Sequence, residues 1–196
     1  MVAQRSQLRV AAAQISVTDD IAGNSKRIFE TMRRSLYEGI QVVVFPETAV
    51  TGYSPSIGHG RGSSEWPRIA EVLLEIASQS TRLGLWTIVG SEAWDGEAWR
   101  NRLYAYSDAG ELVATYDKVH LTSGDTEYYR AGSQNTVFDL QGVTVGLQIC
   151  YDARFPEGYR DLLAQGAEVI VQGFYGAGRD TWKVPVLGAH LRSRAA

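Results

Sequence analysis

The chain has 196 residues, of which 44% are hydrophobic and 21% charged, which is typical of a globular protein with one sizeable domain. Its net charge of −3 provides no basic surface for nucleic acid, and its single cysteine excludes an internal disulfide framework. No apolar run approaches the roughly 20 residues of a membrane-spanning helix, and the first ten residues lack the apolar core of a signal peptide. We therefore expect a cytoplasmic protein with neither a nucleic-acid partner nor a membrane.

The N-terminal part predicts a strand, a helix and a second strand. Residues 8–15 are small and apolar, as in a tightly packed strand. Asn24 or Ser25 can cap the helix that follows, because the next apolar residues recur at helical spacing. Residues 41–47 then form the apolar run expected of a strand that is buried on both faces. This order is that of a βαβ unit.

A loop rich in glycine, serine and proline follows over residues 48–64, and its length indicates a binding role. Trp66 and Pro67 then open a predicted helix, residues 85–90 predict a third strand, and residues 94–100 predict a surface turn. Further along, alternating apolar and polar residues around turn signals indicate two β-hairpins, with strands at 103–106, 112–116, 137–140 and 143–149.

The only cysteine, Cys150, ends the last of these strands. Beyond it the sequence predicts a helix over 157–165, a strand over 168–172 and a helical final part within 179–196. No repeat, low-complexity segment or linker interrupts this order. We therefore expect residues 1–196 to form a single α/β domain with a mostly buried sheet and hairpins inserted in its middle.

Three reactive side chains each follow the end of a predicted strand: Glu47, Lys118 and Cys150. Such strand ends are where α/β sheets bind their ligands. Each residue alone has a structural explanation, as a loop acid, a solvated lysine and a small buried hydrophobe. Together they suit nucleophilic catalysis, because a carboxylate can take the proton of a thiol and a fixed ammonium can stabilise negative charge.

Three segments resemble the signature segments of the nitrilase superfamily of carbon–nitrogen hydrolases, in the order of that family. They are residues 43–53 (VVFPETAVTGY), 116–121 (YDKVHL) and 146–157 (GLQICYDARFPE). Asn101 resembles the asparagine that opens the central hairpin of that family. The resemblance implies an α-β-β-α sandwich, assembled as a homodimer or a larger homo-oligomer. The residues around the cysteine resemble the amidase-like branch, which acts on small amides.

Carried over to this chain, the resemblance makes Glu47 the general base, Lys118 the electrostatic stabiliser and Cys150 the nucleophile. Cys150 would attack an amide carbonyl or a nitrile carbon, and Lys118 and the backbone N–H of Tyr151 would hold the oxyanion. An amide would give a thioester and release ammonia. The implied chemistry requires no metal and no organic cofactor, and its partner is a small-molecule amide or nitrile.

The family also has a second glutamate between the lysine and the nucleophile strand. Counting from Lys118 without gaps places this acid at Asp125, whereas the local sequence Gly124-Asp-Thr-Glu127 points to Glu127. We expect Glu127, because aspartate is one methylene shorter and would reach differently. The other acid would then be a solvated loop residue.

Aromatic residues beside the signature segments are candidate walls of a substrate pocket, although Tyr53 and Phe155 also suit a core. The candidates are Tyr53, Tyr151, Phe155 and Tyr175. Arg154 can reach a substrate carboxylate, but we expect it to pair with a neighbouring acid such as Asp152.

The sequence ends in a segment, residues 191–196, that resembles a helix which the family continues into the final strands of its second sheet. We therefore expect a sandwich that is incomplete at the C-terminus, with an exposed sheet edge and apolar surface. We also expect weak or absent activity unless a completing segment is supplied.

Three alternatives to an amidase remain open. The chain can be a truncated, catalytically degenerate relative that acts as a binding or assembly module, or it can be a true nitrilase. A hydrolase that pairs Cys150 with His120 is the third alternative. We expect His120 to be a structural histidine, since it lies two residues from Lys118 and on a strand would share its face.

Overall fold

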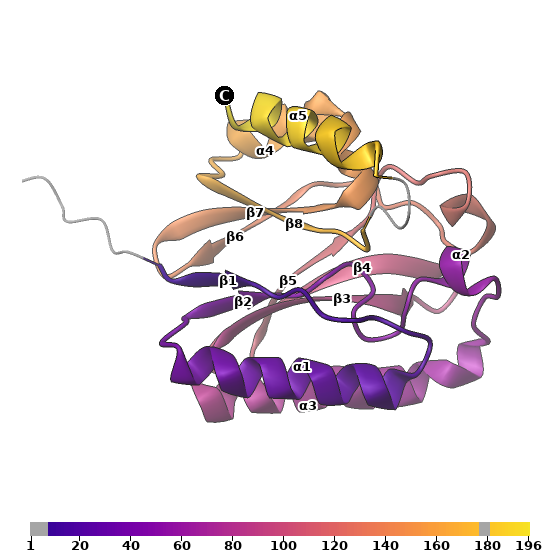
Figure 1. Cartoon of the computed structure of the whole chain (residues 1–196), viewed down its shortest axis with the longest axis vertical. Helices are drawn as coiled ribbons and strands as arrows, with labels where there is room; N and C mark the ends of the chain where they lie inside the picture. Colours follow the sequence, from indigo (N-terminus) through magenta and orange to yellow (C-terminus); the bar gives the residue numbers. More distant parts are fainter. Residues whose placement is uncertain (1–7, 177–180) are drawn as a thin grey trace, which may run out of the picture.

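The computed structural model describes residues 8–176 and 181–196, so part of the predicted C-terminal segment, including Arg179, lies outside the described residues. The chain forms two β-sheets packed face to face, with helices on both outer sides (Figure 1). One side carries α1 (Ile21–Tyr37) and α3 (Trp66–Leu83), and the other carries α4 (Pro156–Ala164) and α5 (Lys183–Ala195). This is the α-β-β-α sandwich that the resemblance implied, so that prediction is confirmed.

The larger sheet is parallel in its first part and antiparallel in its second. Its strands, in spatial order, are β1 (Val10–Ala12), β2 (Val42–Val44), β3 (Trp86–Trp94), β4 (Trp99–Tyr106) and β5 (Leu112–Asp117). The smaller sheet joins an antiparallel pair to a parallel neighbour. Its strands are β6 (Thr136–Leu140), β7 (Val143–Ile149) and β8 (Val169–Gly173).

The βαβ unit and both predicted hairpins are present, but a further hairpin was missed. Residues 94–100 were expected to be a surface turn, whereas β3 and β4 remain paired as far as Trp94 and Trp99. Asp95 closes this tight turn, because its carboxylate accepts hydrogen bonds from the backbone N–H groups of Glu97 and Ala98. The polar composition around Gly96 therefore marks a hairpin tip.

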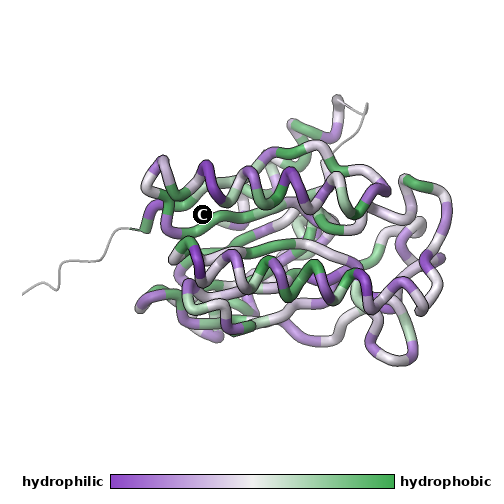
Figure 2. Tube along the Cα trace, turned by 90° about the horizontal axis from the view of Figure 1, so that it is seen from below, coloured by the Kyte–Doolittle hydropathy of each residue, from purple (hydrophilic) through white to green (hydrophobic). Residues whose placement is uncertain are grey.

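Two apolar cores explain why β2 and β3 are hydrophobic almost throughout. Val43 and Val89 face the helices α1 and α3, whereas Val42 and Ile88 face the other sheet. Alternation of the side chains across each strand supplies both cores from one run of sequence. The hydropathy pattern in Figure 2 agrees, because the outer helices alternate between hydrophobic and hydrophilic residues along the tube.

Helix α1 starts earlier than predicted. Asp20 caps it by accepting a hydrogen bond from the N–H of Ala22, whereas Asn24 and Ser25 are buried inside the helix. The Asn24 side chain donates instead to the carbonyl of Val50, and so connects the helix to the loop after β2. That loop contains two short helical turns, α2 (Ser54–Ile57) and η1 (Ser63–Glu65).

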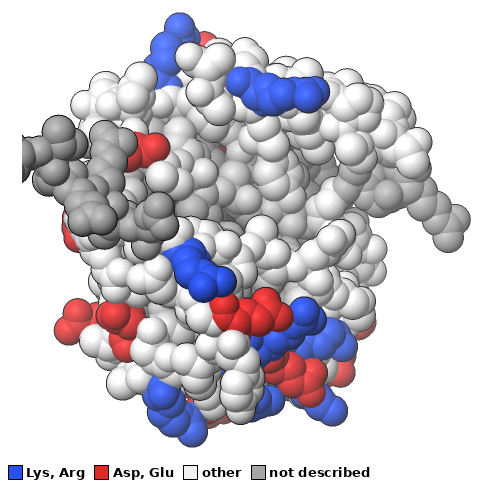
Figure 3. Space-filling view, turned by 60° about the vertical axis from the view of Figure 1, so that its left-hand side comes forward, with Lys and Arg blue, Asp and Glu red and all other residues white. Residues whose placement is uncertain are grey.

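Charged side chains are unevenly distributed over the face shown in Figure 3. They gather over the lower layer, which α1 and α3 form, and are sparse over the layers above it. Within residues 8–176 and 181–196, no helix combines the length and the apolar character that crossing a bilayer requires.

Candidate active site

The loop after β2 places Glu47 directly over β3. The loop can pass this closely because residue 90 is glycine: a β-carbon there would lie 2.4 Å from the carbonyl oxygen of Pro46. Glu47 is 1% exposed, and both of its carboxylate oxygens accept hydrogen bonds. Asn101 Nδ2 donates to Oε1 at 2.8 Å, and the backbone N–H of Tyr175 donates to Oε2 at 2.9 Å. The carboxylate is therefore fixed in orientation.

Lys118 follows β5 and extends into the space between two acids. Its Nζ lies 2.8 Å from Glu47 Oε1 and 2.8 Å from Asp125 Oδ2, and its side chain is 1% exposed. Burial alone would lower the pKa of Lys118, but the negative charges of Glu47 and Asp125 raise that pKa above its ordinary value. Lys118 is therefore a fixed cation at neutral pH.

Cys150 is held in a left-handed backbone conformation at the end of β7, with φ at +42°. Residues other than glycine adopt this conformation at a cost of about 1–2 kcal/mol. Gln172 Nε2 donates to the Cys150 carbonyl at 3.1 Å and supports the turn. A short helical turn, η3 (Cys150–Arg154), separates the thiol from α4, which begins at Pro156, one residue before the predicted start of this helix.

The thiol is protonated at neutral pH. Burial of the sulfur and the negative charge of Glu47 raise the pKa of Cys150 well above its ordinary value, although Lys118 opposes them. The sulfur therefore needs a base to remove its proton before it can act as a nucleophile. Glu47, whose charge acts on both the thiol and the lysine, is positioned for that role.

Asp152 stabilises the turn that carries Cys150. Its Oδ2 accepts hydrogen bonds from the N–H of Ile149 at 3.0 Å and from the hydroxyl of Tyr116 at 2.9 Å. Its Oδ1 accepts the N–H of His120 at 2.9 Å and lies 2.8 Å from His120 Nδ1. His120 therefore has a structural partner, which argues against the Cys–His alternative. We had expected Arg154 to pair with Asp152, but it does not. Arg154 is exposed, and its guanidinium lies 5.2 Å from the Tyr151 ring centre.

The acid that reaches Lys118 is Asp125, and our preference for Glu127 is therefore corrected. Asp125 is buried at the start of the short turn η2 (Asp125–Glu127). It receives hydrogen bonds from the N–H of Thr122 and the hydroxyl of Tyr53. Glu127 is exposed. It lies two residues after Asp125 in a 3₁₀ turn, so its side chain points about two thirds of a turn away from the direction of the Asp125 side chain. Burial opposes ionisation of Asp125, but Lys118 and these hydrogen bonds hold its pKa below the ordinary value.

Asp125→Asn and Glu127→Gln therefore form a matched pair. The first change removes a buried carboxylate from Lys118, so we expect amide turnover to fall by about 10- to 100-fold. The second change affects an exposed side chain and should leave turnover within about 2-fold of the wild type. Steady-state kinetics of both variants measure this difference, and a larger loss in Glu127→Gln would reverse the assignment.

The four predicted aromatic wall residues fall into two groups. Tyr53 and Tyr175 lie beside the acids and the lysine, with ring centres 5.0 Å apart and Lys118 Nζ 5.8 Å from the Tyr53 ring centre. Burial and the hydrogen bond to Asp125 raise the pKa of Tyr53, so its hydroxyl remains a donor. Tyr151 and Phe155 instead pack against each other, and Phe155 stacks on His120 at 3.7 Å.

Sequence reasoning missed the support that Asn101 gives to Glu47, and the N–H of Tyr175 as a second donor to it. Asn101 had been noticed only as a hairpin residue. The sequence carried little signal of this role, because Asn101 lies between Arg100 and Arg102 and only the structure shows that it is buried. The Tyr175 N–H had no sequence signal, because any residue supplies a backbone donor.

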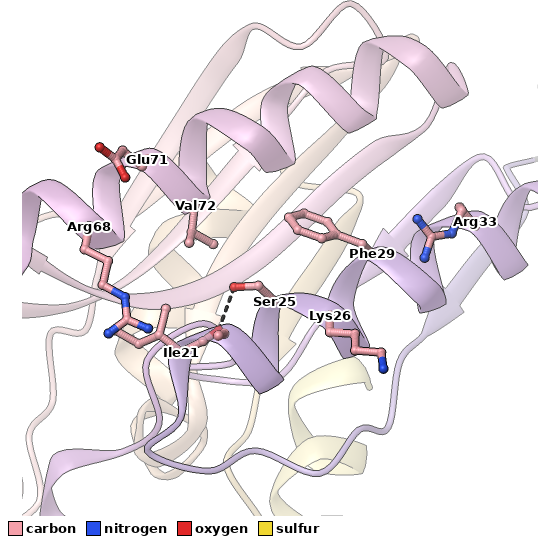
Figure 4. Close-up of a pocket in the computed structure, with 9 residues that line it drawn as sticks. Ile21, Ser25, Lys26, Phe29, Arg33, Arg68, Glu71 and Val72 are labelled. Carbon is pink, nitrogen blue, oxygen red and sulfur yellow. Dashed lines mark hydrogen bonds between the residues drawn. The ribbon is translucent and has the colours of Figure 1, made fainter.

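The groove of Figure 4 lies away from this cluster, on the outer side of the helical layer. It has a volume of about 480 Å³, and Arg68, Lys26 and Arg33 lie along it, on α3 and α1. The one hydrogen bond drawn there is donated by Ser25 to the carbonyl of Ile21 within α1. Over the described ranges of the chain, no group of three or more His, Cys, Asp or Glu side chains is placed to hold a metal ion.

Comparison with known proteins shows the family of the chain. The sequence model of the carbon-nitrogen hydrolase family matches residues 9–196. A deaminated glutathione amidase from Yersinia enterocolitica is 30% identical over 177 residues, or 82% of this chain and 60% of that protein. A nitrilase from Pyrococcus abyssi is 27% identical over 159 residues, or 75% of this chain and 56% of that protein.

A solved mutant amidase from Nesterenkonia sp. AN1 shows the result of Michael addition of acrylamide at its active-site cysteine. It matches at 25% identity with a TM-score of 0.85, over 96% of this chain and 74% of that chain.

These similarities place the chain among the α-β-β-α proteins of the nitrilase superfamily. The chain belongs to the carbon–nitrogen hydrolase family. It spans 60% and 56% of the lengths of the two curated relatives above.

Proposed function

We propose that this chain carries the site of an amidase, which hydrolyses the C–N bond of a small amide through a thioester on Cys150. The observation that supports this most directly is the position of the Lys118 ammonium, 2.8 Å from both the Glu47 and the Asp125 carboxylates. Two buried acids and a buried cation are costly to assemble in a fold. Beside a cysteine in a left-handed turn, they are well explained as catalytic groups.

The first half-reaction forms the thioester. Glu47 takes the thiol proton of Cys150 while the sulfur attacks the amide carbonyl carbon. The carbonyl electrons move onto oxygen, and the Lys118 ammonium and the N–H of Tyr151 stabilise this oxyanion. When the oxyanion collapses, the C–N bond breaks, and Glu47 gives its proton to the departing ammonia.

The second half-reaction regenerates the enzyme. Glu47 removes a proton from water, and the resulting hydroxide attacks the thioester carbon. The C–S bond then breaks, Glu47 returns the proton to the sulfur, and a carboxylic acid leaves as the thiol of Cys150 is restored. Asp125 takes no proton in this scheme. It orients Lys118 by sharing the ammonium with Glu47.

The competing proposal is a catalytically degenerate relative that binds an amide without cleaving it. The experiment is an ammonia-release assay on the purified chain, with short aliphatic amides, ω-amides of dicarboxylic acids, N-carbamoyl compounds and the matching nitriles. We expect ammonia release from amides and none from Cys150→Ala. Mass spectrometry should detect the acyl group on Cys150. Amide binding with neither ammonia nor an acyl adduct would favour the degenerate relative.

A further inference from the structure

Glu92 is a buried acid that the mechanism above does not use. It lies on β3 directly opposite Asn101 on β4, and its side chain is 1% exposed. Side chains of directly opposed residues project from the same face of an antiparallel pair. Asn101 uses this position to hold Glu47. Glu92 therefore stands beside the residue that orients the general base.

The Glu92 carboxylate collects four donors from the loop after β2 and from the turn after η2. Its Oε1 accepts the hydroxyl of Ser54 at 2.5 Å, the N–H of Ser54 at 3.2 Å and the hydroxyl of Tyr129 at 2.5 Å. Its Oε2 accepts Arg61 Nε at 2.7 Å, and the Arg61 side chain is only 5% exposed. A buried carboxylate with this many partners holds them in one arrangement.

The partners of Glu92 are attached to the partners of Lys118. Ser54 follows Tyr53 in the chain, and the N–H of Tyr129 donates to the carbonyl of Asp125 at 2.8 Å. Tyr53 and Asp125 are in turn joined by a hydrogen bond of 2.6 Å. A closed ring of contacts therefore runs from Glu92 through Ser54 and Tyr53 to Asp125, and returns through Tyr129.

We infer that Glu92 is a positioning residue for the reaction. It fixes the loop that carries Tyr53 and the turn that carries Asp125, so that Asp125 holds the Lys118 ammonium where the oxyanion forms. Arg61 neutralises the buried charge of Glu92 and attaches the same loop by donating to the carbonyl of Thr51. This inference rests on the proposed function, because the amidase reaction supplies the oxyanion.

The mildest test removes one hydroxyl from the ring of contacts. Tyr129→Phe deletes the hydrogen bond to Glu92, and Tyr128→Phe is the matched control. The Tyr128 hydroxyl makes no hydrogen bond to any residue in the described ranges. We expect Tyr129→Phe to lower kcat by about 10-fold with KM within about 2-fold, and Tyr128→Phe to change neither. If Tyr129→Phe does not fold, Ser54→Ala removes the other hydroxyl on Glu92 and takes its place.

Two further measurements separate positioning from a general loss of stability. Tyr53→Phe should show less than a multiplicative loss when combined with Tyr129→Phe, because both act through Asp125. The rate of Cys150 alkylation by iodoacetamide should change at least about 3-fold in Tyr129→Phe and remain at the wild-type value in Tyr128→Phe. This second measurement still decides the inference if the wild type releases no ammonia and the proposed function fails. Equal behaviour of the two tyrosine variants in both assays, or a multiplicative loss in the double variant, would overturn the role of Glu92.

Discussion

Glu47→Gln is expected to lower amide turnover by roughly 10²- to 10⁴-fold, the range typical of losing general acid–base catalysis. The pKa of the Cys150 thiol is raised, so the sulfur is protonated at neutral pH and depends on a base. Glutamine matches the shape of glutamate and can still accept a hydrogen bond from Asn101 Nδ2, but it cannot take the thiol proton or deliver it to ammonia. Ammonia release under saturating amide measures the loss.

Glu97→Gln is the matched control for this change. Glu97 is 78% exposed in the β3–β4 turn, where it contacts Arg130, and its replacement should leave turnover unchanged. A Glu47→Gln variant with more than about a fifth of wild-type turnover, while Cys150→Ala is inactive, would show that another group serves as the base.

Lys118→Met is expected to abolish turnover and to lower the free energy of unfolding by about 3–5 kcal/mol at pH 7, as when one partner of a buried ion pair is removed. Methionine fills a similar volume but leaves Glu47 and Asp125 buried without their shared cation. Lys26→Met, an exposed position on α1, is the control and should shift the unfolding free energy by less than about 0.5 kcal/mol.

The pH dependence of this loss has a definite sign. In the wild type the pKa of Asp125 is lowered, so its contribution to stability is complete above about pH 4 and is lost as the pH falls through the folded-state pKa. The raised pKa of Lys118 keeps the cation present up to at least about pH 10. The difference between wild type and Lys118→Met should therefore be large at pH 7 and shrink towards pH 3, where the contribution of the Asp125–Lys118 pair to the wild type is lost. Urea unfolding at both pH values measures it, and an equal difference at both would contradict the ion-pair explanation.

Sequence reasoning located Glu47, Lys118 and Cys150 because each follows a strand, and strand ends are visible as the limits of apolar runs. The structure brings Glu47 and Lys118 into direct contact. The fold class was equally predictable. The βαβ order and the two hairpins are encoded locally, and the signature segments resemble those of the nitrilase superfamily.

The second acid of the site could not be identified from the sequence in this way. Asp125 and Glu127 differ by two positions in one short turn. The direction of the Asp125 side chain depends on two hydrogen bonds that leave no periodic pattern: the N–H of Thr122 donates to the Asp125 carboxylate, and the N–H of Asp125 donates to the Thr122 hydroxyl. Glu92 and Asn101 were missed as supports for a related reason. They flank a turn whose polar composition concealed the pairing of β3 with β4, and only that pairing places them opposite each other.

The left-handed backbone at Cys150 has a consequence for attempts to raise the thermal stability of this protein. Glycine would adopt the same conformation without the steric conflict of a β-carbon, so the residue that suits the turn best has no nucleophile. Laboratory evolution that rewards heat resistance alone would favour glycine at position 150 and remove the reactive sulfur. Stability and reactivity are therefore opposed at a single residue, and any selection on this scaffold has to include turnover.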